Sequence, residues 1–131
     1  MTESNIVDRE RIPTESGVLT LEVSQCRDVS VIYCKGELDT YTAPWLHELT
    51  KQRLTANYPS LIIDLTEVDF LDACSLGKLI WIHEHSRKLQ GNICLVVAKE
   101  TNSVRRVLEI TGLDKFFDHQ PSVEEALHLL S

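Results

Sequence analysis

Leu61-Ile62-Ile63-Asp64-Leu65 is a short, nearly continuous apolar stretch, and it decides the fold class of this 131-residue chain. Such a run is typical of a strand that is buried on both faces in the middle of a parallel sheet. Ile93-Cys94-Leu95-Val96-Val97 repeats the pattern. Helical patterns flank these stretches at residues 42–57, 73–90 and 104–113, and Gly91 is the expected left-handed residue after the second helix. Strands that alternate with helices predict an α/β fold with crossover connections.

The residues outside this central part predict the two ends of the sheet. Residues 18–23 and 29–34 are apolar and β-branched, and Arg27-Asp28 between them indicates a short hairpin connection. Phe116-Phe117 predicts a short edge strand, and a capping box at 122–125 begins a last helix. We expect one domain over residues 18–131, with a mixed, mostly parallel sheet of four or five strands and about four helices. Residues 1–17 lack apolar periodicity and predict a flexible N-terminal leader.

Charge and hydropathy exclude several classes of partner. Thirteen Lys and Arg against twenty Asp and Glu give a net charge of −7, whereas nucleic acid or an anionic membrane requires a basic face. No apolar stretch reaches the roughly 18 residues of a membrane span, and the N-terminus is acidic where a signal peptide is basic. We therefore predict a cytoplasmic protein that binds neither nucleic acid nor membranes.

The cysteines fit that compartment. They are far apart and form no C-x-x-C motif, so the sequence predicts free thiols and neither a zinc site nor a redox dithiol. The four positions are Cys26, Cys34, Cys74 and Cys94.

Two predicted loops, 36–41 and 66–75, follow consecutive parallel strands. Loops at the carboxyl ends of such strands share one rim of the sheet, where function gathers. Six acidic residues concentrate in this part of the chain, which permits Mg²⁺ binding or a solvated acidic face that meets a basic partner. We favour the second interpretation and expect no cofactor. The six are Glu37, Asp39, Asp64, Glu67, Asp69 and Asp72.

No catalytic site emerges from the sequence. No nucleophile, base and acid share a predicted loop, and the five glycines are too scattered for a phosphate-binding loop. His83 and His85 lie two positions apart on a predicted helix, so their rings point in directions about 200° apart and cannot share a metal. We predict that the protein is not an enzyme.

Gly36-Glu37-Leu38-Asp39 and Asp72-Ala73-Cys74-Ser75-Leu76-Gly77 together carry a family resemblance. They resemble the STAS domain of bacterial anti-sigma factor antagonists, whose hallmarks are G-E-L-D after the second strand and D-S-S-G-L-G at the start of the second helix. The resemblance extends from about residue 18 to residue 130. It implies a domain that binds a serine-kinase anti-sigma factor and thereby releases a sigma factor.

The chain departs from this family pattern at the position that controls binding. In the family, the kinase phosphorylates the serine directly after the motif aspartate, and this ends the binding. Here that position is Ala73, which has no hydroxyl. We predict binding that the usual phosphorylation does not switch off, with Ser75 as a displaced acceptor to be tested.

The expected contact surface combines the two loops with the start of the second helix. Asp39 and Asp72 supply charge, and Trp81 supplies apolar area. A helix N-cap that accepts from the Ser75 N–H also explains Asp72, whereas no cap requires Asp39. We expect a monomer or weak homodimer whose partner is the anti-sigma factor. The surface comprises Glu37, Asp39, Thr40, Tyr41, Asp72, Cys74, Ser75, Lys78 and Trp81.

Two alternatives remain open. Cys74 near a helix N-terminus suits a redox-active thiolate, although a small substitute for serine is the simpler interpretation. The chain also fits a degenerate STAS module that serves as a regulatory subunit of another signalling or transport complex, redox-tuned through Cys74.

Overall fold

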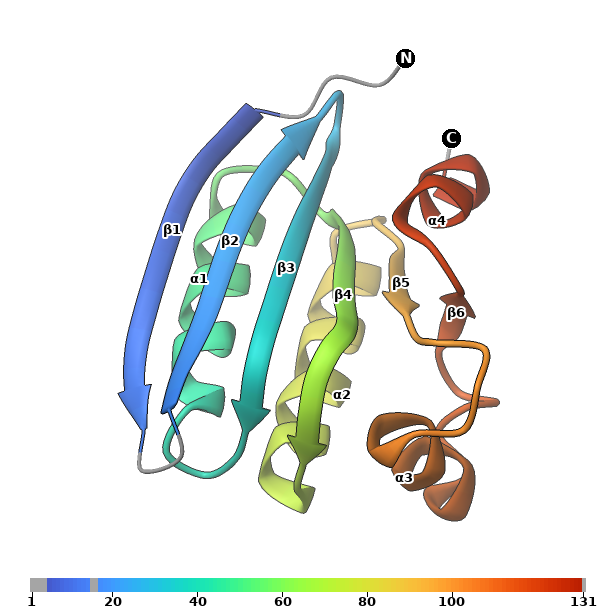
Figure 1. The fold of residues 1–131 in the computed structure, drawn as a ribbon. Coiled ribbons are helices and arrows are strands. Elements are labelled where there is room, and N and C mark those ends of the chain that lie inside the picture. The colour runs from blue at the N-terminus through green and yellow to red at the C-terminus, as the bar shows by residue number, and fades with distance from the viewer. Residues whose placement is uncertain (1–4, 15–16, 131) are drawn as a thin grey trace.

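A computed structural model describes residues 5–14 and 17–130. The elements alternate after an initial series of strands, as Figure 1 shows. In chain order they are β1 (Asn5–Thr14), β2 (Gly17–Cys26), β3 (Val29–Leu38), α1 (Ala43–Thr55), β4 (Ser60–Leu71), α2 (Ala73–Lys88), β5 (Ile93–Val96), α3 (Ser103–Thr111), β6 (Asp118–Gln120) and α4 (Val123–Leu130). The predicted α/β fold with four helices is confirmed for these residues.

The strands form one mixed sheet in the order β1-β2-β3-β4-β5-β6. The pairs β1–β2 and β2–β3 are antiparallel, and the three pairs from β3 to β6 are parallel. The sheet is therefore mixed and mostly parallel, as predicted, but it has six described strands in place of the four or five expected.

The additional strand is β1, so the prediction of a flexible leader is wrong for residues 5–14. β1 pairs along its length with β2, and Arg9 forms a salt bridge with Glu22 at 2.8 Å. Ile12 is its buried side chain among residues 8–14, because an edge strand needs few apolar contacts and is protected by charges and proline. The charged residues of β1 gave no apolar pattern from which a strand could be predicted. Residues 1–4 and 15–16 of the predicted leader lie outside the described residues.

Two further boundaries differ from the sequence prediction. β4 continues through Thr66 to Leu71, because Val68 and Leu71 face the core while the two residues between them are exposed. Register shifts in its pairing with β3 break the simple alternation that reveals a strand. Phe116 and Phe117 form no strand, since both donate their N–H groups to the carbonyl of Leu113 in a helical turn.

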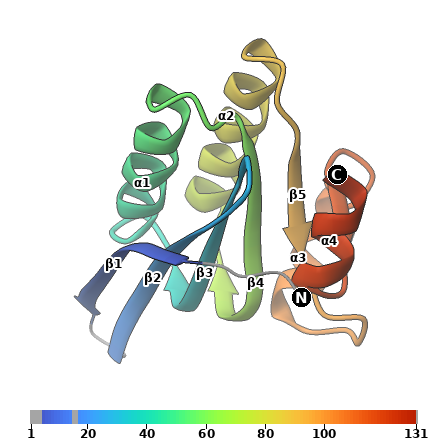
Figure 2. The same ribbon diagram turned by 90° about the horizontal axis from the view of Figure 1, so that it is seen from above.

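Helices cover the two faces of the sheet unequally, as Figures 1 and 2 show together. α1 and α2 lie side by side on one face, where α3 also contributes Val104 and Leu108 to the main core. α4 lies on the other face, where Ala126 packs with Ile62 and Cys94. Among the described helices, α4 alone covers this second face, at the start of β3 and β4 and at β5, and the rest of that face is open. In the described residues no helix is long and apolar enough to cross a bilayer.

α2 ends in a Schellman motif, which shows why Gly91 is a glycine. The left-handed residue is Gln90, with φ 66°, and not Gly91 as the sequence predicted. Gln90 donates its N–H to Arg87 O, and Gly91 donates to Ser86 O at 2.8 Å. A Cβ on Gly91 would lie 2.2 Å from Pro59 O, so the segment before β4 passes directly against this glycine.

We expect Gly91→Ala to lower the free energy of unfolding by about 2–3 kcal/mol, the cost of forcing backbone apart in a packed core. Gly77→Ala is the matched control, because a Cβ on Gly77 in α2 has no neighbour within 4 Å. That change should raise stability by about 0.5–1 kcal/mol through helix propensity. Urea unfolding measures both, and similar small effects for the two variants would contradict the close packing at Pro59.

Candidate functional site

The carboxyl ends of β3 and β4 lie side by side and form the rim predicted from the sequence. Leu38 is paired with Leu71 in the last register position, and the Asp72 N–H donates to Leu38 O at 3.3 Å. The β3–α1 loop, residues 39–42, and the start of α2 therefore adjoin each other. The helices α1 and α2 both begin at this rim (Figure 1).

Asp39 shapes the first loop through its side chain. Its Oδ1 accepts from the N–H groups of Tyr41 at 2.9 Å and Thr42 at 3.0 Å, which is an Asx turn. Asp39 is not the N-cap residue of α1, which is Thr42, but this turn gives its carboxylate a local structural role. Thr42 makes no side-chain cap for α1. Its hydroxyl instead donates to Glu37 O and accepts from the Asp39 N–H, which closes the loop on itself.

Asp72 joins this loop to α2. Its Oδ1 accepts from the Ser75 N–H and hydroxyl, both at 2.9 Å, so the predicted N-cap is confirmed. Its Oδ2 accepts from the Thr40 N–H at 3.0 Å and lies 3.4 Å from the Thr40 hydroxyl. One carboxylate thus caps α2 and holds the neighbouring loop, which makes the rim a single preformed surface.

These hydrogen bonds also set the acidity of Asp72. Partial burial of the carboxyl group raises its pKa, but the bonds from Ser75 and Thr40 together outweigh burial, and the net pKa lies below the ordinary value. Asp72 is therefore ionised at neutral pH and carries its charge at the rim.

The first residues of α2 differ sharply in exposure. Ala73 is exposed and Cys74 is half-buried, whereas Ser75 is 1% exposed and its hydroxyl is bonded to Asp72. Ser75 was expected as a contact residue and as a displaced phosphate acceptor. Its burial is the reason to remove it from the contact surface, since neither a partner nor a kinase reaches it in this conformation.

Trp81 is also not the exposed anchor expected from the sequence. Its ring is half-buried between two histidines, with centroid distances of 4.2 Å to His47 of α1 and 3.7 Å to His85. The periodicity of α2 placed Trp81 off its apolar stripe, but α1 packs along that side. Lys78, one turn earlier, is half-buried beside the rim.

Exposed aromatic side chains occur at three other positions near the rim. Tyr41 in the loop is 86% exposed, and Trp45 in the first turn of α1 and Phe70 near the end of β4 are each 46% exposed. Sequence reasoning missed Trp45 and Phe70. Trp45 lies off the stripe of Leu46 and Leu49 that α1 buries, and this spacing was the available signal.

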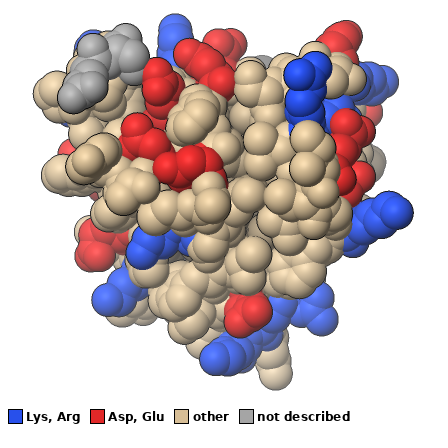
Figure 3. Space-filling model, turned by 90° about the horizontal axis from the view of Figure 1, so that it is seen from below, with Lys and Arg blue, Asp and Glu red and all other residues tan. Residues whose placement is uncertain are grey.

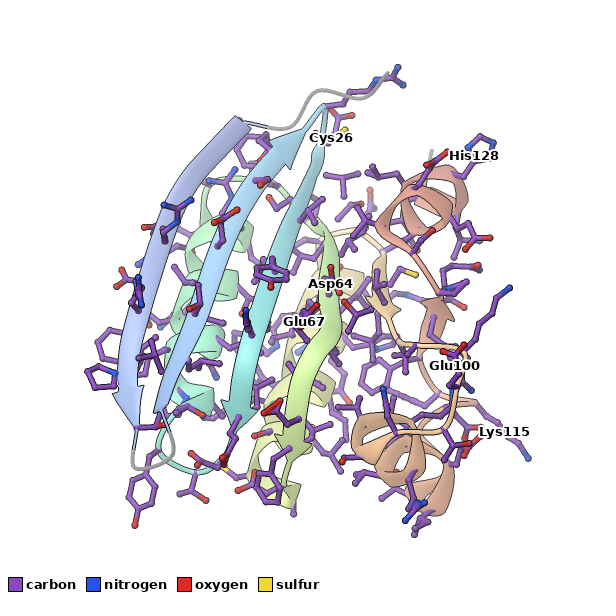
Figure 4. All side chains as sticks on the ribbon, viewed as in Figure 1. Cys26, Asp64, Glu67, Glu100, Lys115 and His128 are labelled. Carbon is purple, nitrogen blue, oxygen red and sulfur yellow. The ribbon has the colours of Figure 1, made fainter. Side chains whose placement is uncertain are left out.

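The acidic residues divide between the rim and the open face of the sheet. Figure 3 looks onto the rim and shows acidic side chains gathered on one side of it. Glu37, Glu67 and Asp69 line a hollow of about 360 Å³ there, together with Lys35. Asp64 lies farther up β4 on the open face, as labelled in Figure 4. Burial and then Glu67 and Asp64 raise the pKa of the neighbouring Tyr33.

The predicted grouping of all six acids on one rim is wrong, because Asp64 lies within β4, away from the end of the strand at the rim. Within the described residues, no three His, Cys, Asp or Glu side chains are arranged to hold a metal ion.

The four cysteines are free thiols in the structure, as predicted. Burial, with a smaller contribution from Asp64, raises the pKa of Cys34, and burial followed by Asp118 raises that of Cys94 to about 11. Cys26 is also buried, so Cys74 is the thiol that a reagent or partner reaches first.

Replacing Asp72 should separate its two roles. We expect Asp72→Ala to lower the free energy of unfolding by about 2 kcal/mol, and Asp72→Asn, which can still cap α2, by about 1 kcal/mol. Because the folded-state pKa of Asp72 is lowered, its stabilisation is complete above the ordinary pKa and disappears as pH falls through the folded value. The difference between wild type and Asp72→Asn in urea unfolding should therefore shrink from pH 7 toward pH 3; a constant difference would contradict a charged carboxylate.

Curated proteins similar to this chain are named anti-sigma factor antagonists. The chain is 30% identical over 109 residues to the anti-sigma-F factor antagonist RsfB of Mycobacterium tuberculosis, which covers 83% of this chain and 87% of RsfB. It is 33% identical over 87 residues to the anti-sigma-B factor antagonist of Listeria monocytogenes, covering 66% of this chain and 75% of that protein.

A solved structure of an anti-sigma factor antagonist has a similar fold. The crystal structure of an anti-sigma factor antagonist from Mycobacterium paratuberculosis superposes with a TM-score of 0.79 at 31% sequence identity, covering 91% of this chain and 98% of that one. The family described as the STAS domain matches residues 20–126, which include both loops of the rim and the start of α2. The chain therefore belongs to the STAS domain family.

Proposed function

We propose that this protein is an anti-sigma factor antagonist, which binds an anti-sigma factor through the rim and so releases a sigma factor in the cytoplasm. Membership of the STAS family and the names of the similar proteins support this class of function. The observation that carries the proposal is the bond between Thr40 and Asp72, because it joins the loop that follows the first signature segment to the second segment in one exposed surface. The partner's serine-kinase character is inferred from the family resemblance alone.

The contact surface combines charge on one side with apolar area beside it. Tyr41, Trp45 and Phe70 supply exposed aromatic area, the kind of residue that dominates binding energy. Acidic side chains border this area and favour a partner with a basic contact face. The surface keeps Glu37, Asp39, Thr40, Tyr41, Asp72, Cys74 and Lys78 from the sequence prediction, adds Trp45 and Phe70, and omits Ser75 and Trp81.

The absence of a hydroxyl at residue 73 makes the proposed binding constitutive. Ala73 is exposed at the first position of α2, where a phosphoryl group would add about −1.5 to −2 charges to the contact surface. Alanine cannot accept that group. The alternative acceptor, Ser75, donates its hydroxyl to Asp72 and is buried, so phosphorylation there requires the first turn of α2 to open.

Truncation of the exposed loop aromatic should reduce binding. We expect Tyr41→Ala to weaken affinity for the purified anti-sigma factor of the same organism at least about tenfold. Leu129→Ala is the control, since Leu129 is 49% exposed but belongs to α4 on the opposite face of the sheet. Isothermal titration calorimetry measures both. Equal affinities for Tyr41→Ala and the control would remove the rim as the contact surface.

Restoring the hydroxyl should restore the switch. Incubation of Ala73→Ser with the anti-sigma factor and ATP is expected to add one phosphoryl group and to abolish binding, while the native protein keeps its mass and its affinity. Mass spectrometry followed by titration calorimetry measures both. A phosphorylated native protein modified at Ser75 would overturn the constitutive interpretation, and an unmodified Ala73→Ser protein would argue against a kinase partner.

A further inference from the structure

Helix α2 is attached to its neighbours through histidines on two sides. Toward α1, the ring of Trp81 lies between His47 and His85, and both pairs are stacked. The His85 Nδ1 is also 3.0 Å from Trp81 O, to which it donates a hydrogen bond. This three-ring stack forms part of the seam between α1 and α2.

On its other side, α2 meets the turn that follows α3. His83 lies 4.5 Å from Phe116 and 5.6 Å from Phe117, measured between ring centroids, and the two phenylalanines contact each other edge to face at 4.9 Å. Phe117 is buried in the main core. His83 therefore links α2 to the segment that leads into β6.

His47 and His83 share an unusual feature. Among the described residues, the buried side-chain nitrogen and oxygen atoms without a hydrogen-bond partner are the Nδ1 atoms of His47 and His83. A neutral imidazole tolerates this arrangement, because its unprotonated nitrogen carries no N–H group. An imidazolium carries an N–H on both nitrogens, so protonation leaves a buried charged donor without an acceptor.

The charges around each ring also oppose protonation. For His47, burial comes first, followed by Lys78 of α2 and Lys51 of α1, and His85 acts in the same direction; Glu48 opposes them, and the net pKa is lowered. For His83, burial and then Arg87 lower the pKa, against Asp118 of β6 and Glu84 of α2.

We propose that the His47–Trp81–His85 stack and the His83–Phe116–Phe117 cluster form an acid-sensitive attachment of α2, which loosens when His47 and His83 are protonated. Either the ring keeps an unpartnered buried N–H, or it turns toward solvent and leaves its aromatic neighbours. Because Asp72 of the rim caps α2, loosening of this helix also disturbs the rim. The consequence for partner binding rests on the proposed function, whereas the attachment itself does not.

The direction of the effect follows from linkage. A histidine whose folded-state pKa is lowered stabilises the fold fully above its unfolded pKa of about 6.5, and this stabilisation decreases as pH falls through that value toward the folded pKa. Asp72 does not interfere in this range, because its pKa is lowered and it stays ionised.

The test compares urea unfolding of the whole protein at pH 7.5 and pH 5.5. The wild-type midpoint should be lower at pH 5.5, and His47→Phe/His83→Phe, which keeps the ring contacts, should lose at least half of this difference. His128→Phe is the control, since His128 is exposed on α4 (Figure 4) and should leave the difference unchanged. A double variant with the wild-type pH dependence would overturn the proposal.

Two further measurements complete the test. NMR titration of the wild-type imidazole protons needs no variant: His47 and His83 are expected to titrate below 6.5, and values at or above 6.5 would overturn the proposal even if the double variant does not fold. Affinity for the anti-sigma factor should decrease at least threefold from pH 7.5 to pH 5.5 in the wild type and less in the double variant. No binding at pH 7.5 refutes the proposed function and leaves the unfolding and NMR results to decide the attachment.

Discussion

The Asp72 carboxylate accepts hydrogen bonds from both Ser75 and Thr40, and the geometry of the rim depends on this double role. A carboxylate has two oxygens with separate lone pairs, so one oxygen can cap a helix while the other binds a neighbouring loop. This requires the ends of β3 and β4 to be adjacent, which their parallel pairing up to Leu38 and Leu71 provides. The site thus depends on the sheet topology, which places the ends of β3 and β4 side by side. Asp72 then joins the segments that follow these two strands into one surface.

The residues that the sequence predicted well are those with a local cause. The N-cap role of Asp72 depends on a residue three positions later. The buried parts of β4 and β5 are predicted by their apolar composition. Residues whose environment is supplied by distant segments were misjudged. Trp81 is covered by His47, 34 positions away in the chain, and Pro59 rather than a turn explains Gly91. β1 was missed because an edge strand gains its stability from backbone pairing, which leaves little trace in side-chain composition.

The candidate site shows the same division. Thr40, Tyr41, Ala73 and Cys74 could be located from the two signature segments, because short motifs fix the backbone around them. These segments did not predict which of the side chains are exposed and which are buried. Ser75 and Ala73 are two residues apart, yet one is bonded to Asp72 in the interior and the other faces solvent. Only the direction of the helix relative to the sheet decides which of them a partner meets.

The loss of the hydroxyl at residue 73 is compatible with an intact rim, because none of the bonds made by Asp72 involves the side chain of that residue. In this architecture the fold and the family's phosphoryl switch are separable: the cap and the loop contact use the aspartate, and the switch uses the next side chain. A chain that loses the switch therefore keeps its contact surface. What can still alter that surface is the attachment of α2 to α1 and to the turn after α3, and both contacts contain a histidine with a buried, unpartnered nitrogen. A phosphoryl group at the start of α2 and protonated histidines along its sides would act on the same helix by different means. The phosphoryl group would repel a partner, whereas the protonated histidines would loosen the helix that carries the contact surface.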